Sequence, residues 1–179
     1  YNVLFISDAT VQVLSRTSTP PTPQLQTAQF TSDGSAVQLT FSAATDRANQ
    51  VGTFPCTNLF DFTGVAIASC QWSDSSNLMV YPGTKLPDNQ LLNVLSPVSL
   101  KSSASVRAAC TQSTSVCAAY VPASAKTVQI TAPASTAQPI VSLRTLSQVS
   151  GCADLILDMS ASSGSGGRAW KTPVFTVTE

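Results

Sequence analysis

The chain has 179 residues, of which 43% are hydrophobic and only 10% are charged, and its formal net charge at pH 7 is zero. This length and apolar content are sufficient for a hydrophobic core. Neutrality argues against nucleic acid or an anionic membrane surface as a partner, since both attract cationic patches. Serine and threonine make up about a quarter of the chain, so hydroxyl groups supply most of its polar surface. So few charges give little repulsion between molecules, which favours association.

The first 23 residues contain two strand-like runs followed by a proline-rich spacer. Residues 1–18 are expected to be the end of a preceding module, and residues 19–23, Thr-Pro-Pro-Thr-Pro, are expected to be extended and stiff. No apolar run is long enough to span a membrane, and the N-terminus does not have the pattern of a signal peptide.

Residues 24–132 have the pattern of one all-β domain. Leu25–Phe30 and Ala36–Phe41 predict a hairpin around the turn signal Asp33-Gly34. Further strands are expected near Phe54–Cys56, Cys70–Trp72, Asn77–Tyr81 and Thr127–Ile130, whereas residues 96–125 are expected to be mainly loops. Short strands with turn residues between them, and no helical periodicity, predict an all-β fold, an antiparallel β-sandwich.

A second spacer, residues 133–138, precedes what we expect to be the first strands of a second β-sandwich module, residues 139–179. Strands are predicted at Pro139–Leu143, at Leu155–Leu157 and at Val174–Val177. The serine- and glycine-rich stretch Ser160–Gly167 is expected to reverse the chain direction between the last two.

The chain contains five cysteines and no histidine. Histidine is the usual general base and a common zinc ligand, so we expect no catalytic residues, no metal and no cofactor. The spacings, with 13 residues between Cys56 and Cys70 and six between Cys110 and Cys117, fit no Cys-x-x-Cys motif. They predict the disulfides Cys56–Cys70 and Cys110–Cys117 in an extracellular protein. Cys152 is left unpaired, or paired outside this chain.

Two sequence patterns could indicate ligand-binding sites, a calcium site and a phosphate-binding loop, but each is better explained by a structural role. Asp154 and Asp158 would share a face of a strand and, with Asp46, Asp61 or Asp88, could bind calcium between modules. Solvated or turn-capping carboxylates are favoured, because no Asp-x-Asp cluster occurs. Residues 164–167 contain three glycines, but the Lys-Ser ending and following helix of a phosphate-binding loop are missing.

The stretch from Cys152 to Trp170 resembles the start of the receptor for egg jelly (REJ) module, which occurs in polycystin-type proteins and in repeat-built surface proteins of algae and other protists. The resemblance rests on Cys152, Leu155-x-Leu157-Asp158, Ser160-x-Ser162, Gly164-x-Gly-Gly-Arg168 and Trp170. Residues 28–41, 52–56, 59–62 and 70–72 more loosely resemble the immunoglobulin-like segment that precedes this motif in the algal proteins. This second resemblance implies that residues 24–132 form an immunoglobulin-like antiparallel β-sandwich. The resemblance implies a cell-surface, ciliary or cell-wall setting. The family pattern continues past Trp170 and supplies further cysteines.

From these observations we expect a structural or interaction module, not an enzyme, in an extracellular filament or surface coat. Its partners would be neighbouring copies or modules, with residues 1–14 or 139–179 completing a sheet of a neighbour. The alternative is a carbohydrate-binding or adhesion receptor ectodomain that recognises surface glycans through Trp72, Tyr81, Tyr120 and Trp170. Burial of both tryptophans would weigh against this alternative. O-linked sugars on the Ser/Thr/Pro spacers are compatible with the composition.

Overall fold

The computed structural model describes residues 19–83, 91–151, 153–165, 170, 172 and 174–176. The predictions for residues 1–18, for Cys152 and for Arg168 lie outside these residues. The strands are β1 (Leu25–Phe30), β2 (Val37–Phe41), β3 (Thr53–Pro55), β4 (Phe60–Asp61), β5 (Ser69–Trp72), β6 (Asn77–Tyr81), β7 (Pro97–Leu100) and β8 (Lys126–Thr131). The helices are α1 (Thr114–Ala118) and the 3₁₀ helices η1 (Arg47–Asn49), η2 (Cys56–Asn58), η3 (Val65–Ile67) and η5 (Ser102–Ala104).

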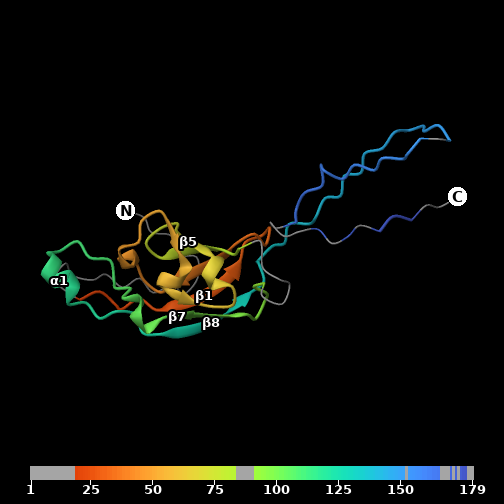
Figure 1. Cartoon of the computed structure of the whole chain (residues 1–179). Coiled ribbons are helices and arrows are strands. Elements are labelled where there is room, and N and C mark those ends of the chain that lie inside the picture. Colours follow the sequence, from red (N-terminus) through yellow and green to blue (C-terminus); the bar gives the residue numbers. More distant parts are fainter. Residues whose placement is uncertain are drawn as a thin grey trace, which may run out of the picture.

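The strands form one mixed sheet in the order β3-β5-β6-β2-β1-β8-β7-β4. Its two edge strands, β3 and β4, are separated in sequence only by η2 and Leu59, so the sheet curls until its edges approach each other. Figure 1 shows the curled sheet as the compact body of the molecule. The predicted all-β class is confirmed. The arrangement differs from the expected pair of antiparallel sheets, because hydrogen bonds join all eight strands and β1 pairs with β8 in parallel.

The predicted hairpin β1–β2 is confirmed. Its strands pair antiparallel from Phe30↔Val37 to Leu25↔Phe41. Alternating residues of β2 are buried, as expected for a strand that has one face on the core. In the turn, Gly34 adopts a φ of 72°, and the Asp33 carboxylate accepts hydrogen bonds from the Thr31 hydroxyl at 2.6 Å and the Ser35 N–H at 3.1 Å.

The core is formed by side chains from every strand. Cys56 and Cys70 are fully buried in it and form a disulfide. Trp72 belongs to the same cluster and contacts Phe41 at a ring-centroid distance of 5.5 Å. The disulfide therefore links η2, which lies between the two sheet edges, to β5 inside the core.

The parallel pairing of β1 with β8 determines where the chain enters and leaves the body. At the start of these strands, the Ser124 hydroxyl donates to the side chain of Gln24 at 2.9 Å. At their end, the Ala137 N–H donates to the Ser32 carbonyl at 2.8 Å. We call the end of the sheet where β1 and β8 begin the proximal pole, and the end where they stop the distal pole. The chain enters at one pole and leaves at the other.

Residues 139–151 and 153–165, which we call the arm, project from the distal pole, away from α1 (Figure 1). Two isolated antiparallel bridges, Ile140↔Ser163 and Arg144↔Asp158, hold its two sides together. No residue of the arm is buried. The strands predicted at Pro139–Leu143 and Leu155–Leu157 are not formed, and residues 174–176 are not in a strand, so a second sandwich module stays a prediction.

Strand β7 and the helices η5 and α1 lie within residues 96–125, the stretch expected to be mainly loops. Strand β7 pairs with both β8 and β4, and α1 is a single short helix. β7 was missed because serine and alanine dominate its surroundings, although Val98 and Leu100 alternate as a half-buried strand requires. Among the residues described, no helix is long and apolar enough to cross a membrane.

Candidate functional site

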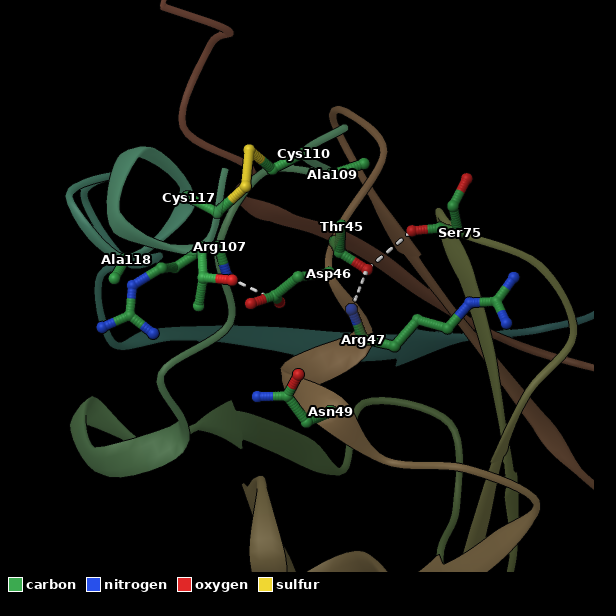
Figure 2. A pocket seen from close by; sticks show the side chains of 11 residues that line it. Thr45, Asp46, Arg47, Asn49, Ser75, Arg107, Ala109, Cys110, Cys117 and Ala118 are labelled. Carbon is green, nitrogen blue, oxygen red and sulfur yellow. Dashed lines mark hydrogen bonds between the residues drawn. A yellow bond between two sulfur atoms is a disulfide. The ribbon is translucent and has the colours of Figure 1, made fainter. Parts of the chain in front are cut away.

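A pocket of about 550 Å³ opens at the proximal pole (Figure 2). Three loops that extend beyond the strands build it: the one after β2, the one between β5 and β6, and the one that leads into α1. Its lining residues are Thr45, Asp46, Arg47, Asn49, Ser75, Arg107, Ala109, Cys110, Thr114, Cys117 and Ala118.

Thr45 and Asp46 hold the three loops together. Thr45 is buried, and its hydroxyl donates to the Ser75 carbonyl at 2.7 Å and accepts from the Arg47 N–H at 3.2 Å. Asp46 Oδ1 accepts from the N–H groups of Ala48 and Arg107, both at 2.9 Å. These bonds satisfy polar groups in the partly buried wall, where an unpaired group would cost about 1–3 kcal/mol.

The pocket wall includes a turn of left-handed backbone. Arg47, Ala48 and Asn49 have φ values of 58°, 48° and 57°. For residues other than glycine this conformation costs roughly 1–2 kcal/mol each, and three in a row are unusual. The Thr45 and Asp46 hydrogen bonds to the N–H groups of Arg47 and Ala48 oppose relaxation of the turn. The turn directs Arg47 outward beside the pocket (Figure 2).

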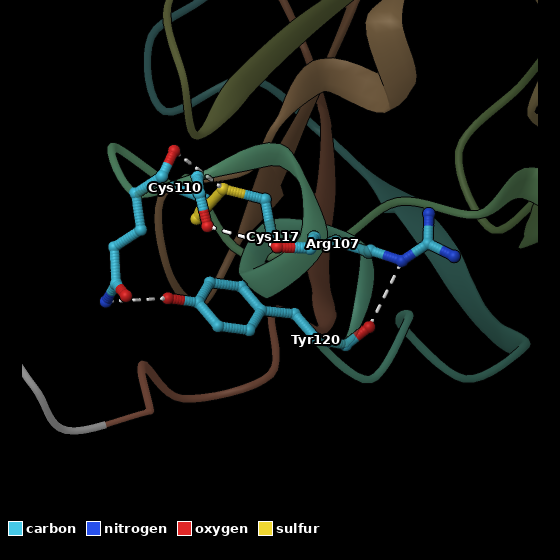
Figure 3. Close-up of a disulfide and its surroundings, with 7 residues drawn as sticks. Arg107, Cys110, Cys117 and Tyr120 are labelled. Atoms are coloured by element: carbon cyan, nitrogen blue, oxygen red, sulfur yellow. Dashed lines mark hydrogen bonds between the residues drawn. A yellow bond between two sulfur atoms is a disulfide. The ribbon is translucent and has the colours of Figure 1, made fainter.

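The opposite wall is the loop closed by the Cys110–Cys117 disulfide (Figure 3). Arg107 Nε donates to the Tyr120 carbonyl at 3.1 Å, and Gln112 Nε2 approaches the Tyr120 hydroxyl at 3.4 Å. Both cysteines are half-buried. The disulfide therefore stiffens a surface loop at the pocket rim.

Three charged groups lie at the pocket and a fourth lies nearby. The Arg107 side chain donates hydrogen bonds to backbone carbonyls. The Asp46 carboxylate accepts hydrogen bonds from backbone N–H groups. The pKa of nearby Asp74 is lowered, mainly by hydrogen bonds from the Asn77 side chain and the Ser76 N–H and least by the Arg47 charge. The Arg47 guanidinium is exposed and has neither a hydrogen bond nor an ion pair to any described residue.

The arrangement is suited to binding. The pocket presents hydroxyl, amide and guanidinium groups, and histidine is absent from the sequence. In the described part of the chain, no three potential metal-ligating side chains come together. Asp46 lies at the pocket, Asp61 is on β4, and Asp154 and Asp158 are on the arm, whereas Asp88 lies outside the described residues. Because residues 154–157 are not in a strand, the shared face expected for Asp154 and Asp158 is not formed.

The cysteines pair as the spacing predicts: Cys56–Cys70 in the core and Cys110–Cys117 at the pocket. Of the four candidate aromatic residues, Trp72 is buried, Tyr120 is half-buried, and Tyr81 and Trp170 are 41% and 51% exposed. No sequence motif predicted Arg47, Arg107 or Asn49 as functional residues. The polar stretch at residues 43–55 was the available signal for Arg47 and Asn49.

No protein-family model, curated protein or solved structure matches this chain.

Proposed function

We propose that this protein is a structural interaction module of an extracellular filament or surface coat, and that copies assemble head to tail. The observation that carries the proposal is the parallel pairing of the first and last strands of the body. It places the incoming and outgoing chain at opposite poles, so modules can be strung in a line without folding back on one another. A body whose first and last strands paired antiparallel would bring both connections to one pole.

The exposed arm supports an interaction role. Its large apolar side chains Ile140, Val141, Leu143, Leu146, Leu155 and Ile156 are between 50% and 70% exposed. A two-stranded ribbon is marginally stable in water, and exposed apolar groups that cluster on a protein mark contact sites. Binding to a neighbour would bury these side chains and extend the pairing of a ribbon that now has two bridges.

Two disulfides indicate a secreted or extracellular protein. The composition agrees with this setting, because a surface rich in hydroxyls and poor in charge gives little repulsion between copies. A ciliary surface or a cell wall as the location rests on the resemblance to REJ-containing surface proteins.

Sedimentation velocity of the purified chain over a range of concentrations tests the proposal. We expect linear oligomers that lengthen with concentration. Leu143→Asn, on the arm, should weaken assembly, whereas Val94→Asn, on the body, should not, and these side chains are matched at 50% and 48% exposure. A chain that stays monomeric at high concentration, or two variants with equal effects, would overturn it.

A carbohydrate-binding ectodomain is the second candidate, favoured by the polar pocket and by the exposed rings of Tyr81 and Trp170. Burial of Trp72 removes one of its four expected contacts. Glycan-array binding that is lost in Tyr81→Ala or Trp170→Ala would support it, and an array without signal would reject it.

A further inference from the structure

The two poles carry features that suit each other. We call residues 145–151 and 153–157, beyond the bridge Arg144↔Asp158, the arm tip. On it, Leu146, Leu155 and Ile156 are 67%, 55% and 70% exposed. Asp154 is the only charged residue of the tip, is exposed, and makes no hydrogen bond or ion pair to a described residue. The tip therefore combines exposed apolar side chains with one negative charge that no described residue pairs.

The proximal pole carries a positive charge and a small apolar wall. Its pocket has one charged side chain without a hydrogen bond to the described residues, the Arg47 guanidinium. The pocket wall opposite the turn that carries Arg47 combines the Cys110–Cys117 disulfide with Ala109 and Ala118, which are small and largely apolar. The carboxylates of Asp46 and Asp74 already accept backbone N–H donors. The pKa of Asp74 is lowered most by a hydrogen bond from the Asn77 side chain, and the Arg47 charge is only the smallest of the causes that lower it.

We infer that the arm tip of one copy docks into the proximal-pole pocket of the next copy, where Asp154 pairs with Arg47 and Leu155 and Ile156 pack against the disulfide wall. The inference rests on the proposed head-to-tail assembly and names its contact. Complementary charges across an interface contribute to specificity and to the rate of association more than to affinity, and like charges placed opposite each other weaken binding.

The same geometry excludes docking within one molecule. The arm leaves the distal pole, where Ala137 is hydrogen-bonded to Ser32 and Gly164 lies against Pro139. The pocket lies at the other pole, beside α1 (Figures 1 and 2). A contact between two different surfaces of identical chains is heterologous, and it produces an open filament unless the rotation closes a ring.

Charge reversal at the two residues tests the contact. Arg47→Asp alone places two carboxylates in the interface, and Asp154→Arg alone places two guanidiniums there. We expect either variant by itself to associate roughly tenfold more weakly than the wild type in sedimentation velocity. Aspartate tolerates the left-handed backbone of position 47, so the fold is preserved, which thermal melting of each variant checks.

Mixing the two variants is the decisive step. In an equimolar mixture, each pocket finds an arm tip of opposite charge, so association should return to within about twofold of the wild type. The matched controls are Lys126→Asp on β8 and Asp61→Arg on β4, which alone and mixed should associate like the wild type.

The outcomes separate the contact from the broader proposal. If the wild type associates and the single reversals associate equally well, or if mixing restores nothing, the Asp154–Arg47 contact is wrong while head-to-tail assembly stands. A wild-type chain that never associates would overturn both.

Discussion

Asp46 and Arg107 are 61 residues apart in sequence and are joined by two hydrogen bonds. The Asp46 N–H donates to the Arg107 carbonyl at 2.8 Å, and the Arg107 N–H donates to Asp46 Oδ1 at 2.9 Å. The same oxygen accepts from the Ala48 N–H. One carboxylate thus holds the left-handed turn at residues 47–49 against the loop that carries the Cys110–Cys117 disulfide, and it shapes the pocket.

Asp46→Ala should lower the free energy of unfolding by about 2 kcal/mol, because two N–H groups lose a charged acceptor. Asp46→Asn keeps one oxygen and should lower it by about 1 kcal/mol. Urea denaturation measures both. Asp61→Ala, an exposed carboxylate on β4, is the control and should change stability by less than about 0.5 kcal/mol. Equal stability of Asp46→Ala and the wild type would show that the carboxylate does not hold the turn.

The Asp33 carboxylate should make the free energy of unfolding depend on pH in the acid range. Hydrogen bonds, first from the Thr31 hydroxyl and then from Ser35, lower the pKa of Asp33 from 3.8 to about 2. A group whose pKa is lower in the folded state stabilises the fold above its unfolded pKa, and this contribution is lost as the pH falls from about 4 to about 2. Since Asp33 is exposed to solvent, we expect its hydrogen bonds to contribute no more than about 1 kcal/mol to the free energy of unfolding.

The stability difference between Asp33→Asn and the wild type should therefore be present at pH 7 and disappear near pH 2. An NMR titration of the Asp33 carboxyl should have its midpoint near 2 in the wild type and a higher one in Thr31→Ala, which lacks the strongest donor. A difference in stability that persists at pH 2 would argue against the carboxylate as its source.

The two disulfides should respond differently to reductant. Cys56 and Cys70 have no exposed surface, whereas Cys110 and Cys117 are half-buried at the pocket rim. Thiolate attack needs access to a sulfur atom, so mild reduction of the folded protein should open Cys110–Cys117 first. Alkylation followed by peptide mass spectrometry identifies the free thiols. Reduction in concentrated urea is the control, in which both bonds should open together. Early labelling of Cys56 in the folded protein would contradict the difference in burial.

The central strands could be predicted because each carries its own local signal. Alternation in β2 and the Asp33-Gly34 turn define the first hairpin, and Asn77–Tyr81 is bounded by Pro82-Gly83. The parallel β1–β8 pair could not be predicted, because it joins residues such as Ala28 and Ile130 that have no sequence relationship. Neither could the curl of the sheet, which depends on packing across the whole core.

The pocket could not be predicted either, because it is built from residues that lie far apart in the sequence. Thr45, Ser75 and Arg107 come from three loops, and nothing in a polar stretch indicates which loops will meet. The left-handed turn at Arg47–Asn49 lacks the glycine that usually marks such backbone. The disulfides were predictable, because the two cysteines of each pair are close in sequence and this spacing limits which cysteines can meet.

The root of the arm depends on Gly164. Its φ is 87°, and a Cβ at this position would lie 2.9 Å from the Cα of Pro139. Backbone atoms cannot move aside as a flexible side chain can, so Gly164→Ala should separate the two sides of the arm at Ile140↔Ser163. The body should keep its stability, because its core ends at Ile130.

Hydrogen exchange measures this separation directly. The amides of Ile140 and Ser163 donate to each other's carbonyls at 2.9 and 3.0 Å, and in Gly164→Ala they should exchange at the rate of an open chain. The amide of Leu39, in the core strand β2, should be unaffected. Gly151→Ala is the matched control, because a Cβ there meets nothing within 4 Å. If both variants left the Ile140 and Ser163 amides as protected as in the wild type, the close contact with Pro139 would not be what holds the arm together.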